Sequence, residues 1–375
     1  MVFLFNLLSF LIPTQLGFHL NFLTSTVFGF KIDYLIPTIY LTDIIIFLLL
    51  FFNIKKIKFK LFTTLLFVSF IIINVLVSQY KIPSIYKWIK VSEMILLGLL
   101  IIKSKNFKVF DNFIKPLSYS IFIACFLGIV QWLLGKTIGG PFYLLGERSF
   151  RLGDPGISAF NMLGTEMLRP YAFFSHPNSF AGFLLVFSIF FIKFKNLFNK
   201  KYFYILSILI ITNLLLTFSL NVFLTIFILI LIYVNPYLNY TFLFIDFGSR
   251  TFSHRIELLK SSLHLIKQNF FVGVGLNNFI PNLVKVSNGF LNSWELQPVH
   301  NIYLLIFSET GIIGLMLFVY LLIRSFIFSK GIKVYIFSLY AILITGLSDH
   351  YWITLQQNIL LFTFVLALSL TSKKK

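Results

Sequence analysis

Long apolar runs alternate with shorter polar segments along this chain. A helix needs about 20 mostly apolar residues to cross a bilayer, and many of the runs approach that length. Besides the N-terminal run MVFLFNLLSFLIP, the pattern predicts helices over residues 36–52, 61–78, 85–102, 116–135, 177–192, 202–218, 219–235, 300–323, 334–348 and 352–370. The expected fold is therefore an all-α polytopic membrane protein with about 10–12 transmembrane helices, forming a single integral membrane domain over residues 1–375.

Composition supports this fold class. Of the 375 residues, 58% are hydrophobic and only 11% are charged, too few to give a soluble domain of this size a polar surface. The N-terminal run has no basic start and no small-residue cleavage site, so it is interpreted as a short membrane helix rather than a signal peptide. The single cysteine, Cys125, lies in an apolar run, which excludes an internal disulfide and a cysteine metal site.

The basic residues indicate the orientation in the membrane. Lysine-rich stretches at 53–60, 103–115, 193–201, 324–333 and 373–375 hold 18 of the 31 basic residues. Because short basic loops stay in the cytoplasm, these stretches and both termini are expected there, and the net charge of +19 does not indicate a nucleic-acid partner. The opposite side then receives a first long outer loop at 136–176 and a second at 236–299.

The orientation requires an odd number of crossings between residues 201 and 250, yet only two apolar helices are visible there. Either YLNYTFLFIDF (237–247) is a short third crossing, or 202–235 is one long bent or re-entrant element. The sequence leaves the crossing number in 202–250 open.

Arginine is concentrated in the two outer loops. Five of the six arginines fall there, namely Arg148, Arg151, Arg169, Arg250 and Arg255. Lysine suffices for cytoplasmic retention, whereas the rigid fork of arginine suits phosphate. The alternative is that these arginines pair with Glu147, Glu166 or Glu257.

Three segments of the outer loops combine polar side chains with helix starts. In Arg169-Pro170…His176-Pro177-Asn178, Asn178 is predicted to cap the following apolar helix and so to turn a positive helix end toward the outside. As a cap alone, Asn178 would need no function.

The second segment, 253–270, fits an amphipathic helix. Its apolar stripe consists of Ile256, Leu259, Leu263, Ile266 and Phe270. Arg255 projects onto that stripe, so it needs a partner such as a phosphate group, unless it extends to water or meets a carboxylate.

The third segment is QPVHNIYLLIFSETGIIG (297–314), in which Pro298 is expected to begin a helix. His300 would stand at its outer mouth, and a histidine there is able to take a proton from a hydroxyl group. Glu309 lies deeper, and Gly311 and Gly314 would allow close helix packing. Asp349-His350 is expected to cap the last outer turn.

Taken in order, these motifs resemble the O-antigen ligase and O-antigen polymerase superfamily. The resemblance rests on Arg169-Pro170, His176-Pro177-Asn178, Ser253-His254-Arg255, Gly273-Val-Gly275, Val299-His300-Asn301-Ile302-Tyr303, Glu309-Thr310-Gly311 and Tyr40-Leu41-Thr42-Asp43. It covers most of the chain.

The resemblance implies a GT-C-like, metal-independent glycosyltransferase that needs no cofactor. Such proteins, which serve polysaccharide and lipopolysaccharide biosynthesis in the cell envelope, move a glycan from undecaprenyl pyrophosphate to a lipid or glycan acceptor at the outer face of the bacterial inner membrane. Carried over, His300 would be the catalytic histidine. Arg255, Arg169 and Arg250 would bind pyrophosphate, and His176, Asn178, Asn301, Tyr303 and Glu309 would support the site.

One departure from the family pattern concerns the donor site. The family usually has a Ser-Arg pair before the large outer loop, whereas this chain has Thr217-Phe218-Ser219-Leu220. Arg250 or Arg169 would have to substitute for the missing arginine. The alternatives to an active enzyme are a polysaccharide or lipid-glycan transporter or flippase, which would carry ionisable groups at the bilayer midplane, and a non-catalytic family remnant. Ligase and polymerase are not separated by any motif.

Overall fold

The structure is a computed structural model. It describes residues 1–21, 25–27, 29–57, 59–162, 164–234, 250–286 and 295–371. The helices are α1 (Val2–Leu11), α2 (Leu41–Asn53), α3 (Leu61–Val77), α4 (Lys81–Lys103), α5 (Lys115–Leu134), α6 (Pro177–Lys193), α7 (Lys200–Leu216), α8 (Leu220–Val234), α9 (Arg250–Gln268), α10 (Phe279–Val286), α11 (Ile302–Phe328), α12 (Lys333–Thr345), α13 (Tyr351–Thr354) and α14 (Gln356–Thr371).

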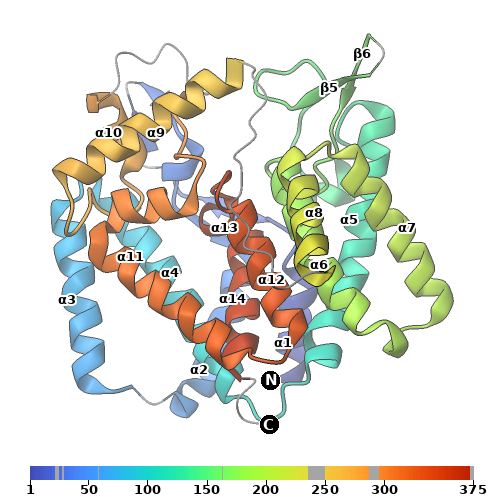
Figure 1. Cartoon of the computed structure of the whole chain (residues 1–375), viewed down its shortest axis with the longest axis horizontal. Helices are drawn as coiled ribbons and strands as arrows, with labels where there is room; N and C mark the ends of the chain where they lie inside the picture. Colours follow the sequence, from blue (N-terminus) through green and yellow to red (C-terminus); the bar gives the residue numbers. More distant parts are fainter. Residues whose placement is uncertain are drawn as a thin grey trace.

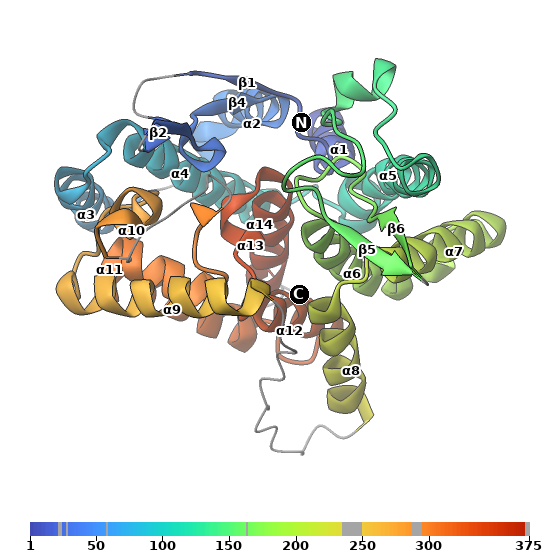
Figure 2. The same cartoon turned by 90° about the horizontal axis from the view of Figure 1, so that it is seen from above.

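The helices form one bundle around α14, which Figures 1 and 2 show in the middle of the molecule. Leu360, Leu361, Phe364 and Val365 of α14 are fully buried among side chains of the neighbouring helices. Both termini lie at one end of the bundle, and α9, α10 and a hairpin lie at the other (Figure 1). The end away from the termini is called the outer end below.

The bundle is apolar outside as well as inside. Residues 110–134 and 302–328 form helices long and apolar enough to span a membrane by length and composition, and six shorter helices are also apolar. On α3, Leu61, Phe62, Leu65 and Leu76 are each more than half exposed. A continuous apolar surface of this kind is typical of contact with lipid, so the chain is a helical membrane protein. The number of transmembrane helices and the GT-C-like arrangement stay predictions.

Three small two-stranded sheets at the outer end distinguish the structure from the purely helical prediction. Strands β1 (Gly17–His19) and β4 (Thr38–Tyr40), β2 (Thr26–Val27) and β3 (Phe30–Lys31), and β5 (Ala159–Met162) and β6 (Thr165–Leu168) pair antiparallel. Consequently the helix predicted over 36–52 begins only at Leu41. The carboxylate of Asp43 accepts a hydrogen bond from the Tyr40 N–H, and this capping interaction fixes the helix start at that point.

A break divides residues 202–235 into α7 and α8, which is compatible with the predicted bent or re-entrant element. Phe218 has a φ of 45°, a left-handed conformation that ends α7. The start of α8 meets the end of α12, where Asn221 donates to the Thr345 carbonyl, and Lys333 at the start of α12 lies over the Tyr233 ring near the end of α8. Helices α8 and α12 are therefore antiparallel. The predicted third crossing at 237–247 lies outside the described residues.

Helix α11 bends at Gly311, and the bend joins it to the end of α9. Gly311 has a φ of 66°, and a Cβ there would lie 2.2 Å from the Phe271 carbonyl oxygen, so glycine is required. Around the bend, Ile312 N–H donates to Phe270 O, Val274 N–H to Ser308 O, and Gly275 N–H to Glu309 O. These backbone bonds connect α9 and both halves of α11.

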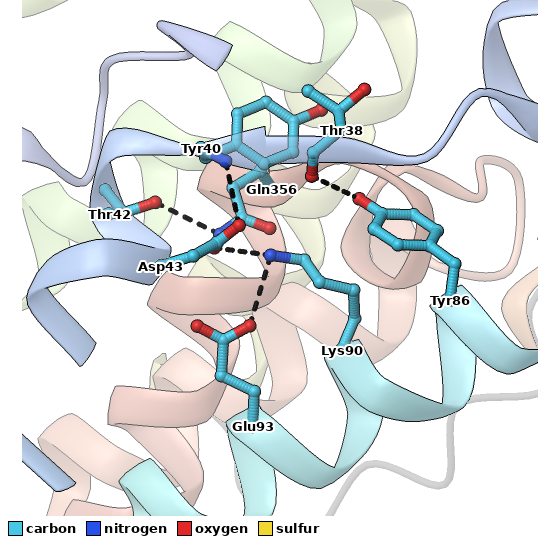
Figure 3. A network of polar contacts seen from close by, with 8 residues as sticks. All are labelled: Thr38, Tyr40, Thr42, Asp43, Tyr86, Lys90, Glu93 and Gln356. Carbon is cyan, nitrogen blue, oxygen red and sulfur yellow. Dashed lines mark hydrogen bonds and ion pairs between the residues drawn. The ribbon is translucent and has the colours of Figure 1, made fainter. Parts of the chain in front are cut away.

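A buried charged network connects α2, α4 and α14. Lys90 on α4 pairs with Asp43 and, at 3.1 Å, with Glu93, as Figure 3 shows. The Gln356 amide at the start of α14 donates to Thr42 Oγ1 and Asp43 Oδ1. The Lys90 side chain is only 8% exposed, so its partners replace the water it has lost.

The next two side chains of α14 continue this anchoring. Gln357 donates to the Phe173 carbonyl at 3.0 Å, and Asn358 donates to the Ser179 carbonyl at 3.1 Å. Three consecutive amides thus hold the outer end of the central helix to α2, to the segment before α6 and to α6 itself.

The network predicts that Lys90→Met destabilises the protein. The substitution keeps the apolar stem but leaves Asp43 and Glu93 without a buried cation, which we expect to cost about 3 kcal/mol. Thermal unfolding of the detergent-solubilised protein measures the loss. Lys81→Met, on the exposed first turn of the same helix, is the matched control. Equal melting temperatures for the two variants would contradict a stabilising role for the network.

Candidate active site

The first part of the site is the start of α6. His176 is the N-cap, and its Nδ1 accepts the Asn178 N–H at 3.1 Å. Because Nδ1 accepts, the ring proton of the neutral tautomer is on Nε2, which lies 3.0 Å from Ser158 Oγ. The prediction that Asn178 caps this helix is therefore wrong. His176 takes that place, which leaves the Asn178 amide available for other partners.

The Asn178 side chain connects Arg169 to Asp349. The sequence had predicted only a helix-capping role for Asp349. The Asn178 Oδ1 accepts from Arg169 Nη2 at 2.7 Å, and the Asn178 Nδ2 lies 3.4 Å from Asp349 Oδ2. Arg169 Nε donates to the Thr217 carbonyl at 2.6 Å. The Arg169 guanidinium thus lies at the α7–α8 break.

Among the described residues, no ion pair joins an outer arginine to Glu147, Glu166 or Glu257, which were the predicted alternative partners. Glu147 accepts from Gln131 and from the N–H groups of Ile138 and Gly139. Arg151 pairs with Asp154 at 3.4 Å, and Arg148 donates to the Ser175 carbonyl at 3.2 Å. Arg151 therefore pairs with Asp154 rather than with one of the glutamates predicted as alternative partners.

The second part of the site is the turn between α12 and α13. Asp349 Oδ1 accepts the His350 N–H at 2.8 Å, and the His350 Nδ1 lies 2.9 Å from Thr354 Oγ1. His350 makes no side-chain cap to α13. Its ring instead lies 5.1 Å from the His300 ring and 5.6 Å from Tyr34, centroid to centroid.

His300 directly precedes α11 rather than lying inside it. The helix begins at Ile302, with Asn301 as its N-cap, so the predicted helix start at Pro298 is wrong. Within the part of the chain that the structure describes, His300 Nδ1 is buried and has no hydrogen-bond partner. Burial lowers the pKa of His300 to about 3, with a smaller effect in the same direction from His350. The ring is therefore neutral at physiological pH.

Arg255 extends to the same cluster from α9. Of the residues on its side of the helix, Ser262 and Ile266 are buried, whereas Leu259 is 44% exposed, so Arg255 lies at the protein-facing border of the helix. Its positive charge lowers the pKa of His300 and His176, after the larger effect of burial. It also lowers the pKa of Asp349, together with the three histidines and against the effect of burial.

Three of the predicted supporting residues have structural roles. Asn301 Oδ1 accepts the N–H groups of Tyr303 and Leu304 and caps α11, and its Nδ2 donates to the Leu347 carbonyl. The Tyr303 hydroxyl donates to the Leu343 carbonyl. Glu309 accepts the Phe279 N–H and holds the start of α10. Arg250 begins α9, and its side chain lies outside the described part.

The structure thus brings together Arg169, His176, Asn178, Arg255, His300, Asp349 and His350, with the first turns of α6 and α11. Two arginines and two helix N-termini attract anions, while Asp349 carries the opposing negative charge. Burial lowers the pKa of His176 to about 4 and also lowers the pKa of His350, so the histidines add hydrogen-bonding groups without adding charge. Within the described ranges, no three His, Cys, Asp or Glu side chains are arranged to hold a metal ion.

These features define a helical membrane protein with a partly buried, cationic site at its outer end. Residues 175–319 match the family model Wzy_C, described as O-antigen ligase. The match includes His176, Asn178, Arg255 and His300, and confirms the resemblance over this range of the chain. A search of curated proteins finds no match.

Sequence reasoning missed Asp349 and His350 as members of the site. Both lie beyond the matched range and were assigned only to a turn. A possible signal was SDHYW (348–352), a charged pair next to aromatic residues between two apolar helices. Polar residues in such a position are costly unless they serve the structure or the function.

The buried histidines predict a loss of stability on acidification. Their folded-state pKa values lie below the ordinary value of about 6.5, so the unfolded chain takes up these protons first. Stability is therefore complete above about pH 6.5 and falls as the pH decreases toward 4. Between pH 7 and 5 we expect a loss of about 1–2 kcal/mol per histidine, measured by thermal unfolding. His176→Asn, which keeps a capping side chain, should flatten the dependence. The exposed His264→Asn is the control, and parallel profiles for the two variants would contradict the prediction.

Proposed function

We propose that this protein is a glycosyltransferase of the bacterial cytoplasmic membrane, with both termini in the cytoplasm. It transfers a glycan from undecaprenyl pyrophosphate to a hydroxyl group of a lipid or glycan acceptor at the outer face. The family match to O-antigen ligase supports this class of reaction. The common end of the two termini and the opposite position of α9 (Figure 1) fit this orientation.

One observation carries the proposal: Arg169, Arg255 and the neutral His300 converge on one site at the outer end. Arg255 is near enough to influence the pKa of His300, and the negative charge of Asp349 acts on both Arg169 and His300. The site therefore has cations for a leaving diphosphate and a base for an attacking hydroxyl. Together these groups meet the requirements of the transfer.

In the donor half, Arg255 and Arg169 bind the pyrophosphate. Arg169 supplies the positive charge that the family obtains from its Ser-Arg pair, since its guanidinium bonds to the Thr217 carbonyl at that position. The N–H groups in the first turns of α6 and α11 add partial positive charge. As the bond between the anomeric carbon and the phosphate oxygen breaks, these groups stabilise the negative charge on the departing lipid pyrophosphate.

In the acceptor half, His300 takes the proton from the acceptor hydroxyl. The oxygen then attacks the anomeric carbon from the side opposite the pyrophosphate, with inversion, and the proton passes from the imidazolium to water. The charge of Asp349 acts to raise the pKa of His300, so it stabilises the imidazolium that forms. The pyrophosphate is an activated leaving group, so the transfer does not depend on a metal ion.

His300→Gln is expected to lower kcat by about 10²–10⁴-fold and to leave the KM for the donor nearly unchanged. The assay uses purified protein in nanodiscs with a lipid-linked glycan and an acceptor. His264→Gln is the control, because His264 is exposed on α9 and bonds to Gln268. Unchanged turnover in His300→Gln would exclude the mechanism. Glycan flux across vesicles without any transfer would indicate a transporter.

Arg255→Lys and Arg169→Lys keep the charge but remove the rigid fork of donors. Each is expected to raise the KM for the lipid-linked donor about 10–100-fold, which corresponds to one charged hydrogen bond. The same assay measures this effect, and Arg151→Lys, whose parent arginine pairs with Asp154, is the control. If the donor KM stays constant in both variants, these arginines do not hold the diphosphate.

A further inference from the structure

Helix α9 has three faces with different surroundings. One face is buried against α10 and α11 and carries Leu258, Ser261, Ser262, Leu265 and Ile266. The remaining surface of the helix is exposed, and it divides into an apolar part and a basic part.

The apolar part is a narrow stripe. Leu259 is 44% exposed, Leu263 49% and Phe270 46%, and the adjacent Phe271 is 69% exposed. At 100° per residue, Leu259 and Leu263 lie about 40° apart around the helix, and Phe270 follows two residues after the helix ends. Of the apolar stripe predicted from the sequence, Ile266 thus faces the protein, while these three residues face outward.

The basic part lies directly beside this stripe. Lys260, His264 and Lys267 are exposed, and the two lysines are displaced by about 70° from the centre of the apolar stripe. An exposed apolar stripe bordered by lysines is typical of helices that lie in the headgroup layer of a bilayer.

The position of α9 fits such a location. In Figure 2 the helix runs lengthwise along the edge of the molecule, and in Figure 1 it crosses the outer end obliquely. The Phe270 ring lies 5.5 Å from Phe307 of α11. Beyond the bend, α11 continues with the exposed apolar residues Met316, Leu317 and Tyr320. The apolar stripe of α9 is therefore continuous with the apolar outer surface of the bundle.

We propose that α9 is an interfacial helix, embedded in the lipid leaflet at the outer end of the bundle. Leu259, Leu263, Phe270 and Phe271 enter the acyl region, and Lys260 and Lys267 bind the phosphate groups of anionic phospholipids. Lipid fits better than a second copy of the chain, because a symmetric contact through this face would bring like-charged lysines together. The proposal does not depend on the proposed enzymatic activity.

This location has a consequence for Arg255. The arginine is on the same helix, at its protein-facing border, so it is held at the depth of the lipid phosphates. A diphosphate attached to a membrane lipid would meet Arg255 without leaving the headgroup layer.

Spin-label accessibility tests the depth of the helix. Cys125 is the only cysteine, so Cys125→Ala provides a background for single labels at positions 259, 263, 260 and 267 in nanodiscs. Met316→Cys gives the lipid reference and the exposed Thr165→Cys the aqueous reference. We expect labels at 259 and 263 to collide frequently with oxygen and rarely with a water-soluble nickel chelate, as at 316. Labels at 260 and 267 should be several-fold more accessible to nickel.

Either of two other results would overturn the proposal. High nickel accessibility at 259 and 263, as at 165, would place the stripe in water. Low accessibility to both reagents would show that another protein or a second copy covers it. Two positions per face are used so that one misfolded variant, detected by gel filtration, does not decide the outcome.

Lipid retention tests the phosphate contacts. Native mass spectrometry of the full chain in phosphatidylglycerol-containing nanodiscs should show tight lipid binding that weakens in Lys260→Gln/Lys267→Gln. A fall of about fivefold per lysine is expected from the attraction of one cation to an anionic surface. Lys136→Gln, at an exposed lysine of the first outer loop, should bind as the wild type does. Equal retention by the double variant would exclude the proposed lysine contacts.

Discussion

Every polar group inside this apolar bundle has to find its partner within the protein, and the arrangement of the outer end depends on that constraint. Gln356, Gln357 and Asn358 meet it at the start of the central helix, where each amide bonds to a different neighbouring segment. Lys90 of α4 satisfies the same constraint by pairing with Asp43 of α2. These contacts hold the start of α14 in place. Because Asp349 and His350 lie only a few residues before α14, the same contacts help to position the candidate site.

The same exclusion of water determines the electrostatics of the site. Burial keeps His176 and His300 neutral by lowering the pKa of each, while Asp349, whose pKa is lowered despite its burial, stays ionised near the permanent charge of Arg255. Two arginines remain as the principal cations. In the proposed mechanism the site therefore combines an anion-binding half with a half that accepts protons.

Helix periodicity and lysine-rich loops were sufficient to predict most helices to within a few residues, because an apolar run between charged segments has few other conformations in a membrane. The predictions were wrong where local capping determines the helix start. The hydrogen bond to Asp43 makes α2 begin five residues later than predicted, at Leu41, and His176 rather than Asn178 caps α6. Arg255, Arg169 and His300 were predicted as site residues from residue type, from position in the outer loops and from the resemblance to the family. Asp349 and His350 were missed, because their proximity to His300 arises from tertiary packing between α11, α12 and α14, which no local pattern encodes.

The backbone bonds between residues 270–275 and the bend of α11 have a mechanical implication. The start of α11, next to His300, is bonded in turn to the end of α12, where Asn301 donates to the Leu347 carbonyl and Ile302 N–H to the Gly346 carbonyl. Arg255, His300 and Asp349 therefore belong to one connected unit of the bundle. A force that displaces α9 would move these three residues together and preserve their mutual alignment.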